Sequence, residues 1–167
     1  MVCVFVNVIK MGRGRSVNEA VAYPVFLHLC PMYVTETQLR VRYGETDRMS
    51  YAYYGVDASY FEVARVEALR MLGLSYRAME EDGILLPVLS YSIQYKKPAY
   101  YDDLLTIRTT VPELPGARIR FAYETYNEKG ELINTAETTL VFVSKATGKP
   151  CPAPEEFLNK LRSFFAG

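Results

Sequence analysis

Five segments of the chain alternate apolar with polar residues, which is the pattern of a β-strand with one buried face. In the first segment, threonine, leucine and valine on one side alternate with glutamine and arginine on the other. The predicted strands are 35–43, 89–95, 105–111, 118–125 and 136–142. The connections between the last four are too short to hold a crossover helix, so we predict that these strands pair antiparallel.

The segment between the first two strands predicts one long apolar helix, over residues 54–72. Gly73 follows its last residue, as is common at helix ends. Glu62 lies off the apolar side, and we expect it to form an ion pair with Arg65 three residues later. At about 3.6 residues per turn, the apolar side chains fall on one broad arc: Val56, Tyr60, Phe61, Ala64, Ala68, Met71 and Leu72.

A helix this apolar needs a large partner surface, and a curved sheet provides one. The order of strand, long helix and four strands therefore predicts an α+β fold, with an antiparallel five-stranded sheet wrapped around one central helix. Shorter helices are predicted over 74–82 and 155–165. Residues 1–31 show no sustained period, so we expect an N-terminal extension that is disordered or upstream of the true start. Residues 32–167 then form a single domain.

Charge and cysteine content narrow the class of protein. Lys and Arg total 19, as do Asp and Glu, which argues against nucleic-acid binding through a concentrated basic face. Cys3, Cys30 and Cys151 lie far apart with no metal-binding spacing, as expected for free thiols in a reducing compartment. No segment reaches the roughly 18 apolar residues of a transmembrane helix. We therefore expect a cytoplasmic protein with no transmembrane segment.

The one histidine, His28, lies outside the predicted domain, so any chemistry there falls to carboxylates and backbone N–H groups. The start of a helix offers unpaired N–H groups and a positive dipole end for a developing oxyanion. Asp47, in the loop ahead of the long helix, is the carboxylate placed to act as general base or nucleophile. Alternatively, Asp47 only makes hydrogen bonds within its loop. Glu45 is expected to be a solvated loop acid.

Several short motifs occur in order over residues 36–160: Tyr43-Gly44-Glu45-Thr46-Asp47, Tyr53-Tyr54, Tyr60-Phe61-Glu62 with Arg65, Gly73-Leu74-Ser75-Tyr76, Leu85-Leu86-Pro87-Val88, Pro98 to Asp103, and Thr147-Gly148-Lys149-Pro150. In order and spacing they resemble the hot-dog-fold acyl-CoA thioesterases. The branch they resemble most is the 4-hydroxybenzoyl-CoA thioesterase-like one, which includes the Tol–Pal-associated thioesterases.

The resemblance implies a hot-dog homodimer or homotetramer that hydrolyses an acyl-CoA to a free acid and CoA, with no bound cofactor. Active sites are expected between subunits, and an acyl carrier protein is a further possible partner. The family's catalytic aspartate falls on Asp47. The N–H that polarises the thioester carbonyl falls on Tyr54, at the expected start of the helix. The substrate-binding candidates are Tyr51, Tyr53, Gly55 and Asp57.

Asp57 departs from the family, which usually has Asn-Tyr where this chain has Val56-Asp57. It lies within the apolar arc of the helix, where an unpaired carboxylate is costly. Three interpretations are open. Asp57 is the N-cap of a helix that begins late, or a second active-site acid with a raised pKa, or a drifted position in a weakened enzyme.

Cations are needed for the CoA phosphates, and the candidates are Lys96, Lys97, Arg118, Lys145 and Lys149, each of which could equally be an ordinary surface charge. The alternative function is a non-catalytic hot-dog module that binds acyl-CoA or acyl carrier protein. A hot-dog dehydratase is disfavoured because such enzymes use a histidine together with a carboxylate.

Overall fold

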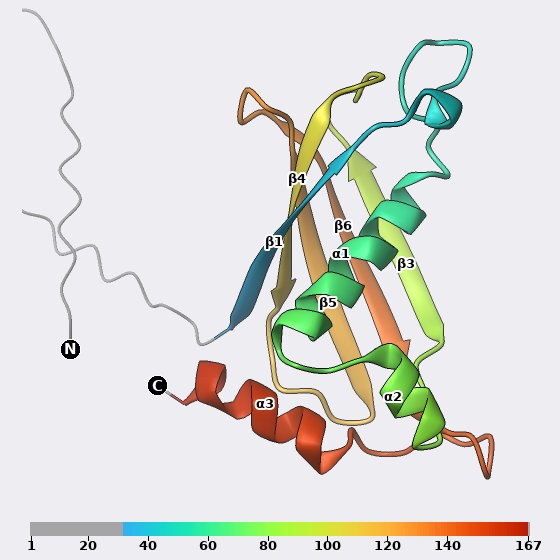
Figure 1. Cartoon of the computed structure of the whole chain (residues 1–167), viewed down its shortest axis with the longest axis vertical. Helices are drawn as coiled ribbons and strands as arrows, with labels where there is room; N and C mark the ends of the chain where they lie inside the picture. Colours follow the sequence, from blue (N-terminus) through green and yellow to red (C-terminus); the bar gives the residue numbers. More distant parts are fainter. Residues whose placement is uncertain (1–31, 167) are drawn as a thin grey trace, which may run out of the picture.

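A five-stranded antiparallel sheet lies against one long helix in the computed structural model, which describes residues 32–166 (Figure 1). The strand order is β1-β4-β5-β6-β3, and α1 (Asp57–Met71) crosses one face of the sheet. The strands are β1 (Tyr33–Arg40), β3 (Val88–Tyr95), β4 (Leu104–Val111), β5 (Arg118–Tyr126) and β6 (Leu132–Val141). The predicted α+β architecture is therefore confirmed.

Several shorter strands and helices flank the five-stranded sheet and α1. β2 (Ile84–Leu85) pairs with β7 (Val143–Ser144), α2 (Tyr76–Glu81) follows α1, and α3 (Glu155–Phe165) ends the chain. A single 3₁₀ turn, η1 (Tyr43–Glu45), leads out of β1. The expectations for residues 1–31, including Cys3, Cys30 and His28, lie outside the described residues. No helix among the described residues is long and apolar enough to cross a membrane.

The core forms where the apolar arc of α1 meets the inner face of the sheet. Phe61 and Tyr123 stack with ring centroids 4.5 Å apart, and Ala64 and Ala68 are fully buried against the strands. Small residues at these positions let the helix approach the sheet closely. Met71 was predicted to lie on the buried arc, but it is the last residue of α1 and its side chain is 61% exposed.

Two boundaries differ from the prediction in ways that shape the site. α1 begins at Asp57, three residues later than predicted, because Tyr53–Val56 form a turn in which the Val56 N–H donates to Tyr53 O at 2.9 Å. β6 begins at Leu132, four residues earlier than predicted. The early start carries Asn134 into the sheet, on the side that faces α1.

Arg65 also differs from its prediction. Its side chain is buried, with 9% exposure, and within residues 32–166 it forms no ion pair with Glu62. The i, i+3 pair on this helix joins Glu67 and Arg70 instead. Arg65 faces Tyr76 and Tyr123, and it partly offsets the rise in their pKa that burial causes.

Candidate active site

The loop between β1 and α1 is anchored by Glu45, whose side chain is only 10% exposed. Its carboxylate accepts hydrogen bonds from the Tyr60 hydroxyl on α1 at 2.7 Å, from the Arg42 backbone N–H at 2.7 Å, and from the Arg42 guanidinium. Burial acts to raise the pKa of Glu45, but these hydrogen bonds outweigh it and hold the pKa below its usual value. The expectation of a solvated loop acid was therefore wrong.

Asp47 lies two residues beyond this anchor and is half-buried. Its Oδ1 accepts a hydrogen bond from the Met49 N–H at 2.7 Å, and its own N–H donates to Tyr51 O at 3.0 Å. The other carboxylate oxygen accepts no hydrogen bond within residues 32–166. Asp47 thus makes the loop contact expected of a structural aspartate and still has one carboxylate oxygen available.

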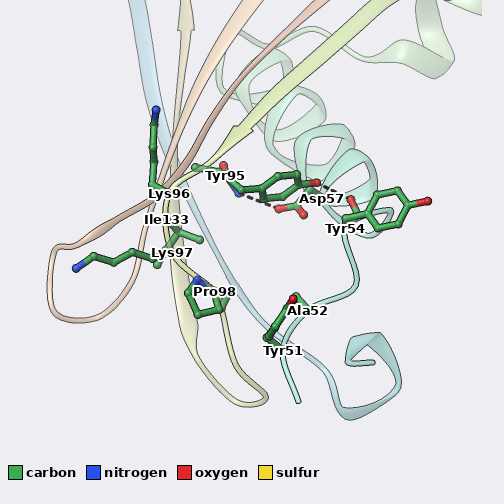
Figure 2. A pocket seen from close by; sticks show the side chains of 11 residues that line it. Tyr51, Ala52, Tyr54, Asp57, Tyr95, Lys96, Lys97, Pro98 and Ile133 are labelled. Carbon is green, nitrogen blue, oxygen red and sulfur yellow. Dashed lines mark hydrogen bonds between the residues drawn. The ribbon is translucent and has the colours of Figure 1, made fainter. Parts of the chain in front are cut away.

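The backbone at Tyr54 is held on both sides. The Tyr53 N–H donates to Glu45 O at 2.8 Å, and Tyr54 O accepts a hydrogen bond from the Tyr95 hydroxyl at 2.8 Å (Figure 2). Among the described residues, the N–H groups of Tyr54 and Gly55 have no acceptor. Tyr54 was predicted to open the helix, but it lies in the preceding turn, three residues before α1 begins.

A cavity of about 410 Å³ opens beside this turn and the N-terminus of α1 (Figure 2). Asp57 and Asn134 contribute buried polar groups to it, with 6% and 1% exposure. Asn134 Nδ2 donates to Asp57 Oδ1 at 2.9 Å. The cavity is lined by Tyr51, Ala52, Tyr54, Asp57, Tyr95, Lys96, Lys97, Pro98, Ala99, Ile133 and Asn134.

Asp57 is not the N-cap that one interpretation predicted, because Val56 caps the helix and Asp57 is its first residue. The late helix start in that interpretation is nevertheless present. Burial raises the pKa of Asp57 to about 6, and hydrogen bonding from Asn134 and the nearby Tyr95 hydroxyl opposes part of that rise. A buried acid with a raised pKa in a cavity fits the second interpretation in its geometry, while its role stays a prediction.

The cavity brings together some of the predicted site residues and separates others. Tyr51, Tyr54, Asp57, Lys96 and Lys97 line it. Lys97 forms an ion pair with Glu131 at 2.6 Å, and Lys96 Nζ donates to Gln94 Oε1 at 3.2 Å.

The other predicted residues, Asp47 among them, do not line the cavity. Tyr53 packs on the Tyr54 ring with centroids 4.5 Å apart, and a Cβ at Gly55 would come within 2.8 Å of the Tyr53 ring. Arg118 opens β5 at the opposite end of the sheet, and Lys145 and Lys149 belong to the hairpin after β7 at that same end (Figure 1).

Tyr95 and Asn134 are site residues that the sequence pattern did not single out. Tyr95 was predicted only as the last residue of the strand 89–95. Asn134 fell just before the predicted start of its strand. The sequence signal for Asn134 is its spacing. A polar residue two positions before Ala136 continues the inward-facing series of Ala136 and Thr138 along β6.

Comparison with known proteins identifies the family to which this chain belongs. Residues 41–161 match the thioesterase-like superfamily. The chain belongs to this superfamily and is a thioester hydrolase with the hot-dog fold, as the motifs predicted.

Individual relatives agree with this assignment. The chain is 34% identical over 119 residues to "Putative acyl-CoA thioesterase YneP" of Bacillus subtilis (strain 168), covering 71% of this chain and 86% of that protein. It is 28% identical over 124 residues to "Acyl-CoA thioester hydrolase YbgC" of Escherichia coli O6:H1, covering 74% and 92%. The solved structure of DHNA-CoA thioesterase from Staphylococcus aureus superposes with a TM-score of 0.72 at 34% identity, covering 80% and 89%.

Proposed function

We propose that this chain hydrolyses acyl-CoA thioesters, with Asp47 as general base or nucleophile and the Tyr54 N–H as oxyanion donor. The proposal rests on two groups of one loop, a carboxylate oxygen of Asp47 and the N–H of Tyr54. Neither group has a hydrogen-bond partner among the described residues. Thr46 and Ala52 form an antiparallel bridge, and this bridge sets the Asp47 segment beside the segment that leads to Tyr54. The names of the relatives support the choice of acyl-CoA as substrate.

In the general-base route, the Asp47 carboxylate takes a proton from water as the water oxygen bonds to the thioester carbon. The carbonyl oxygen becomes an oxyanion and accepts a hydrogen bond from the Tyr54 N–H, aided by the positive end of the α1 dipole. The C–S bond then breaks, and CoA leaves as a thiolate that takes up a proton. In the nucleophilic route, an Asp47 carboxylate oxygen bonds to the carbonyl carbon and the C–S bond breaks, so that CoA leaves as a thiolate that takes up a proton. Water then hydrolyses the resulting anhydride to the free acid and restores Asp47.

Assembly into a homodimer or homotetramer is part of this proposal. β3 is an edge strand of the sheet, and it exposes the apolar side chains of Val88, Leu89 and Tyr91. An apolar edge with unpaired backbone groups favours pairing with another strand. A mass measurement in solution tests this point, since a monomer would contradict it. Lys96 and Lys97, which line the cavity, are the cations that we propose for the CoA phosphates. A cytoplasmic location remains a prediction from the sequence.

The test is Asp47→Asn, assayed for CoA release on short-chain, long-chain and aromatic acyl-CoAs. We expect kcat to fall by roughly a hundredfold or more, with unchanged folding and oligomeric state. Asp82→Asn is the matched control, because Asp82 is an exposed aspartate at the end of α2, which lies at the opposite end of the fold from the loop that holds Asp47 (Figure 1). Turnover retained by Asp47→Asn would contradict the assignment.

The second candidate function is a non-catalytic module that binds acyl-CoA or acyl carrier protein. The presence of an acid at position 57, inside the cavity, is the observation that favours it. Measurable binding of CoA thioesters by the wild-type protein, without turnover on any member of the panel, would support this candidate over hydrolysis.

A further inference from the structure

The hydroxyl of Tyr95 ties the Tyr54 backbone to the edge strand β3. Tyr95 is the last residue of that strand, and its hydroxyl donates to Tyr54 O at 2.8 Å (Figure 2). Within residues 32–166, Tyr54 O accepts no other hydrogen bond. On the other side of Tyr54, the Val56 N–H donates to Tyr53 O at 2.9 Å. The two peptide groups that meet at Tyr54 are therefore each held through their carbonyl oxygen.

The Tyr95 hydroxyl has one hydrogen and two acceptors within reach. The second acceptor is the carboxylate of Asp57, the first residue of α1, to which the same hydroxyl also hydrogen-bonds. Both side chains line the cavity, and Asp57 is only 6% exposed. A hydrogen bond to an ionised carboxylate is roughly twice as strong as one between neutral groups. Ionised Asp57 therefore draws the hydrogen of Tyr95 away from Tyr54 O.

Protonation of Asp57 reverses this competition. A protonated carboxyl has an O–H of its own to donate, and the oxygen of the Tyr95 hydroxyl is an acceptor beside it. The hydrogen of Tyr95 is then left to Tyr54 O, and a hydroxyl that accepts one hydrogen bond donates a stronger one. Burial raises the pKa of Asp57 to about 6, so both forms of the carboxyl are present near that pH.

The other groups around Asp57 do not reproduce this behaviour. Asn134 on β6 donates to Asp57 Oδ1 at 2.9 Å in either state, and its amide does not titrate. The phenols that face Asp57 stay neutral, because burial raises their pKa above the ordinary value of 10.0. The remaining titratable or charged groups that face Asp57 or share its cavity are Tyr60 on α1, Tyr91 on β3, and Lys96 and Lys97 at the cavity wall.

We propose that Tyr95 is a positioning residue for thioester hydrolysis, which holds the Tyr54 backbone for its role as oxyanion donor, and that ionised Asp57 weakens this hold. The inference rests on the proposed function, in which the Tyr54 N–H stabilises the oxyanion. A donor that is already held in place stabilises developing charge without reorganising during the reaction. Tyr95 acts through Tyr54 rather than on the thioester itself.

The first test is Tyr95→Phe, which keeps the ring and removes only the hydroxyl. Activity is measured on whichever of butyryl-CoA, palmitoyl-CoA and benzoyl-CoA the wild-type protein hydrolyses fastest. At pH 5 we expect kcat to fall about fivefold to tenfold with KM little changed, because the lost hydrogen bond supports the transition state. Tyr91→Phe is the matched control, since Tyr91 lies on the same strand and does not line the cavity. Its kcat should equal that of the wild type.

The second test is the pH dependence of that loss. The loss of kcat in Tyr95→Phe should shrink to about twofold by pH 8, because ionised Asp57 then already competes for the hydroxyl in the wild-type protein. In the background of Asp57→Asn, whose amide does not ionise, Tyr95→Phe should lower kcat equally at pH 5 and pH 8. A purely structural role of the hydroxyl would not give a pH dependence that disappears with the carboxyl at position 57.

The outcomes separate this inference from the proposed function. A kcat for Tyr95→Phe equal to that of the wild type at pH 5 would overturn the inference and leave thioester hydrolysis standing. A rise in KM without a fall in kcat would do the same, since Tyr95 would then only contact the substrate. A loss of kcat that is equal at pH 5 and pH 8 in the presence of Asp57 would overturn the competition between the two acceptors. No wild-type turnover on any of the three acyl-CoAs would remove both proposals together.

Discussion

Two carboxylates stand at the N-terminal end of α1, and their surroundings differ. Glu45 is surrounded by donors from Arg42 and Tyr60. Asp57 receives a hydrogen bond from Asn134, has the Tyr95 hydroxyl nearby, and faces a cavity. The pKa of Glu45 is lowered, whereas burial raises that of Asp57 to about 6. Ionised Glu45 therefore stabilises the fold, whereas burial of ionised Asp57 destabilises it.

The largest change in stability is expected at Glu45, whose carboxylate accepts hydrogen bonds from both Arg42 and Tyr60. Glu45→Gln removes the charge from the bonds to Arg42 and weakens the bond to Tyr60, whose side chain is buried. We expect the free energy of unfolding to fall by about 2–3 kcal/mol near pH 7, as measured by urea denaturation. The exposed Glu62 on α1 gives the control variant Glu62→Gln, which should change little. An equal effect in both variants would contradict the anchoring role.

A smaller effect of opposite sign is expected at Asp57. Asp57→Asn keeps an acceptor for Asn134 Nδ2 but removes a buried charge. At pH 8 we expect the variant to be more stable than wild type by about 2 kcal/mol, measured by the same denaturation, since unpaired burial of an ionised carboxylate is unfavourable. A loss of stability would show that the bond to Asn134 outweighs the cost of burial.

The smallest effect is expected for the exposed carboxylates on the outer face of the sheet. Arg108 pairs there with Glu36 at 3.1 Å and with Glu124 at 3.7 Å, and all three side chains are largely exposed. Such pairs contribute little because water and salt screen them. Arg108→Ala should therefore lower the unfolding free energy by less than about 1 kcal/mol, an effect that shrinks further in 0.5–1 M salt.

The sequence predicted the helix and strands around the site more accurately than the residues that line the cavity. The period of Tyr60, Phe61, Ala64 and Ala68 identified the buried face of α1, because burial of apolar residues at helical spacing is a local signal. The start of α1 was placed too early, because the helical period does not show the turn before Asp57, in which the Val56 N–H donates to Tyr53 O.

Contacts across the fold account for the remaining differences. Glu45 looked like a solvated acid because Tyr60, its buried donor, lies 15 residues away. Asn134 was not predicted as a site residue, because its hydrogen-bond partner, Asp57, is 77 residues away in the chain. The sequence also could not separate the cationic candidates. Only the tertiary fold shows that Lys96 and Lys97 line the cavity and that Arg118 lies at the far end of the sheet.

Asp57 is buried, and keeping its ionised form there costs stability because burial outweighs the hydrogen bonds it receives. A carboxyl with a folded-state pKa of about 6, against an ordinary value of 3.8, binds protons more tightly in the folded state. Its contribution to stability is therefore greatest at low pH and falls as pH rises from about 4 to about 6, by about 3 kcal/mol in total. Tyr60, Tyr91 and Tyr95 face Asp57, but they titrate well above this range.

The decisive measurement is the difference in unfolding free energy between Asp57→Asn and wild type, followed by urea denaturation from pH 4 to pH 8. We predict that the stability advantage of the variant grows between pH 4 and 6 and then levels off, because only the wild-type protein has the buried carboxyl to ionise. A difference that stays constant across this range, or that shrinks as pH rises, would contradict the account.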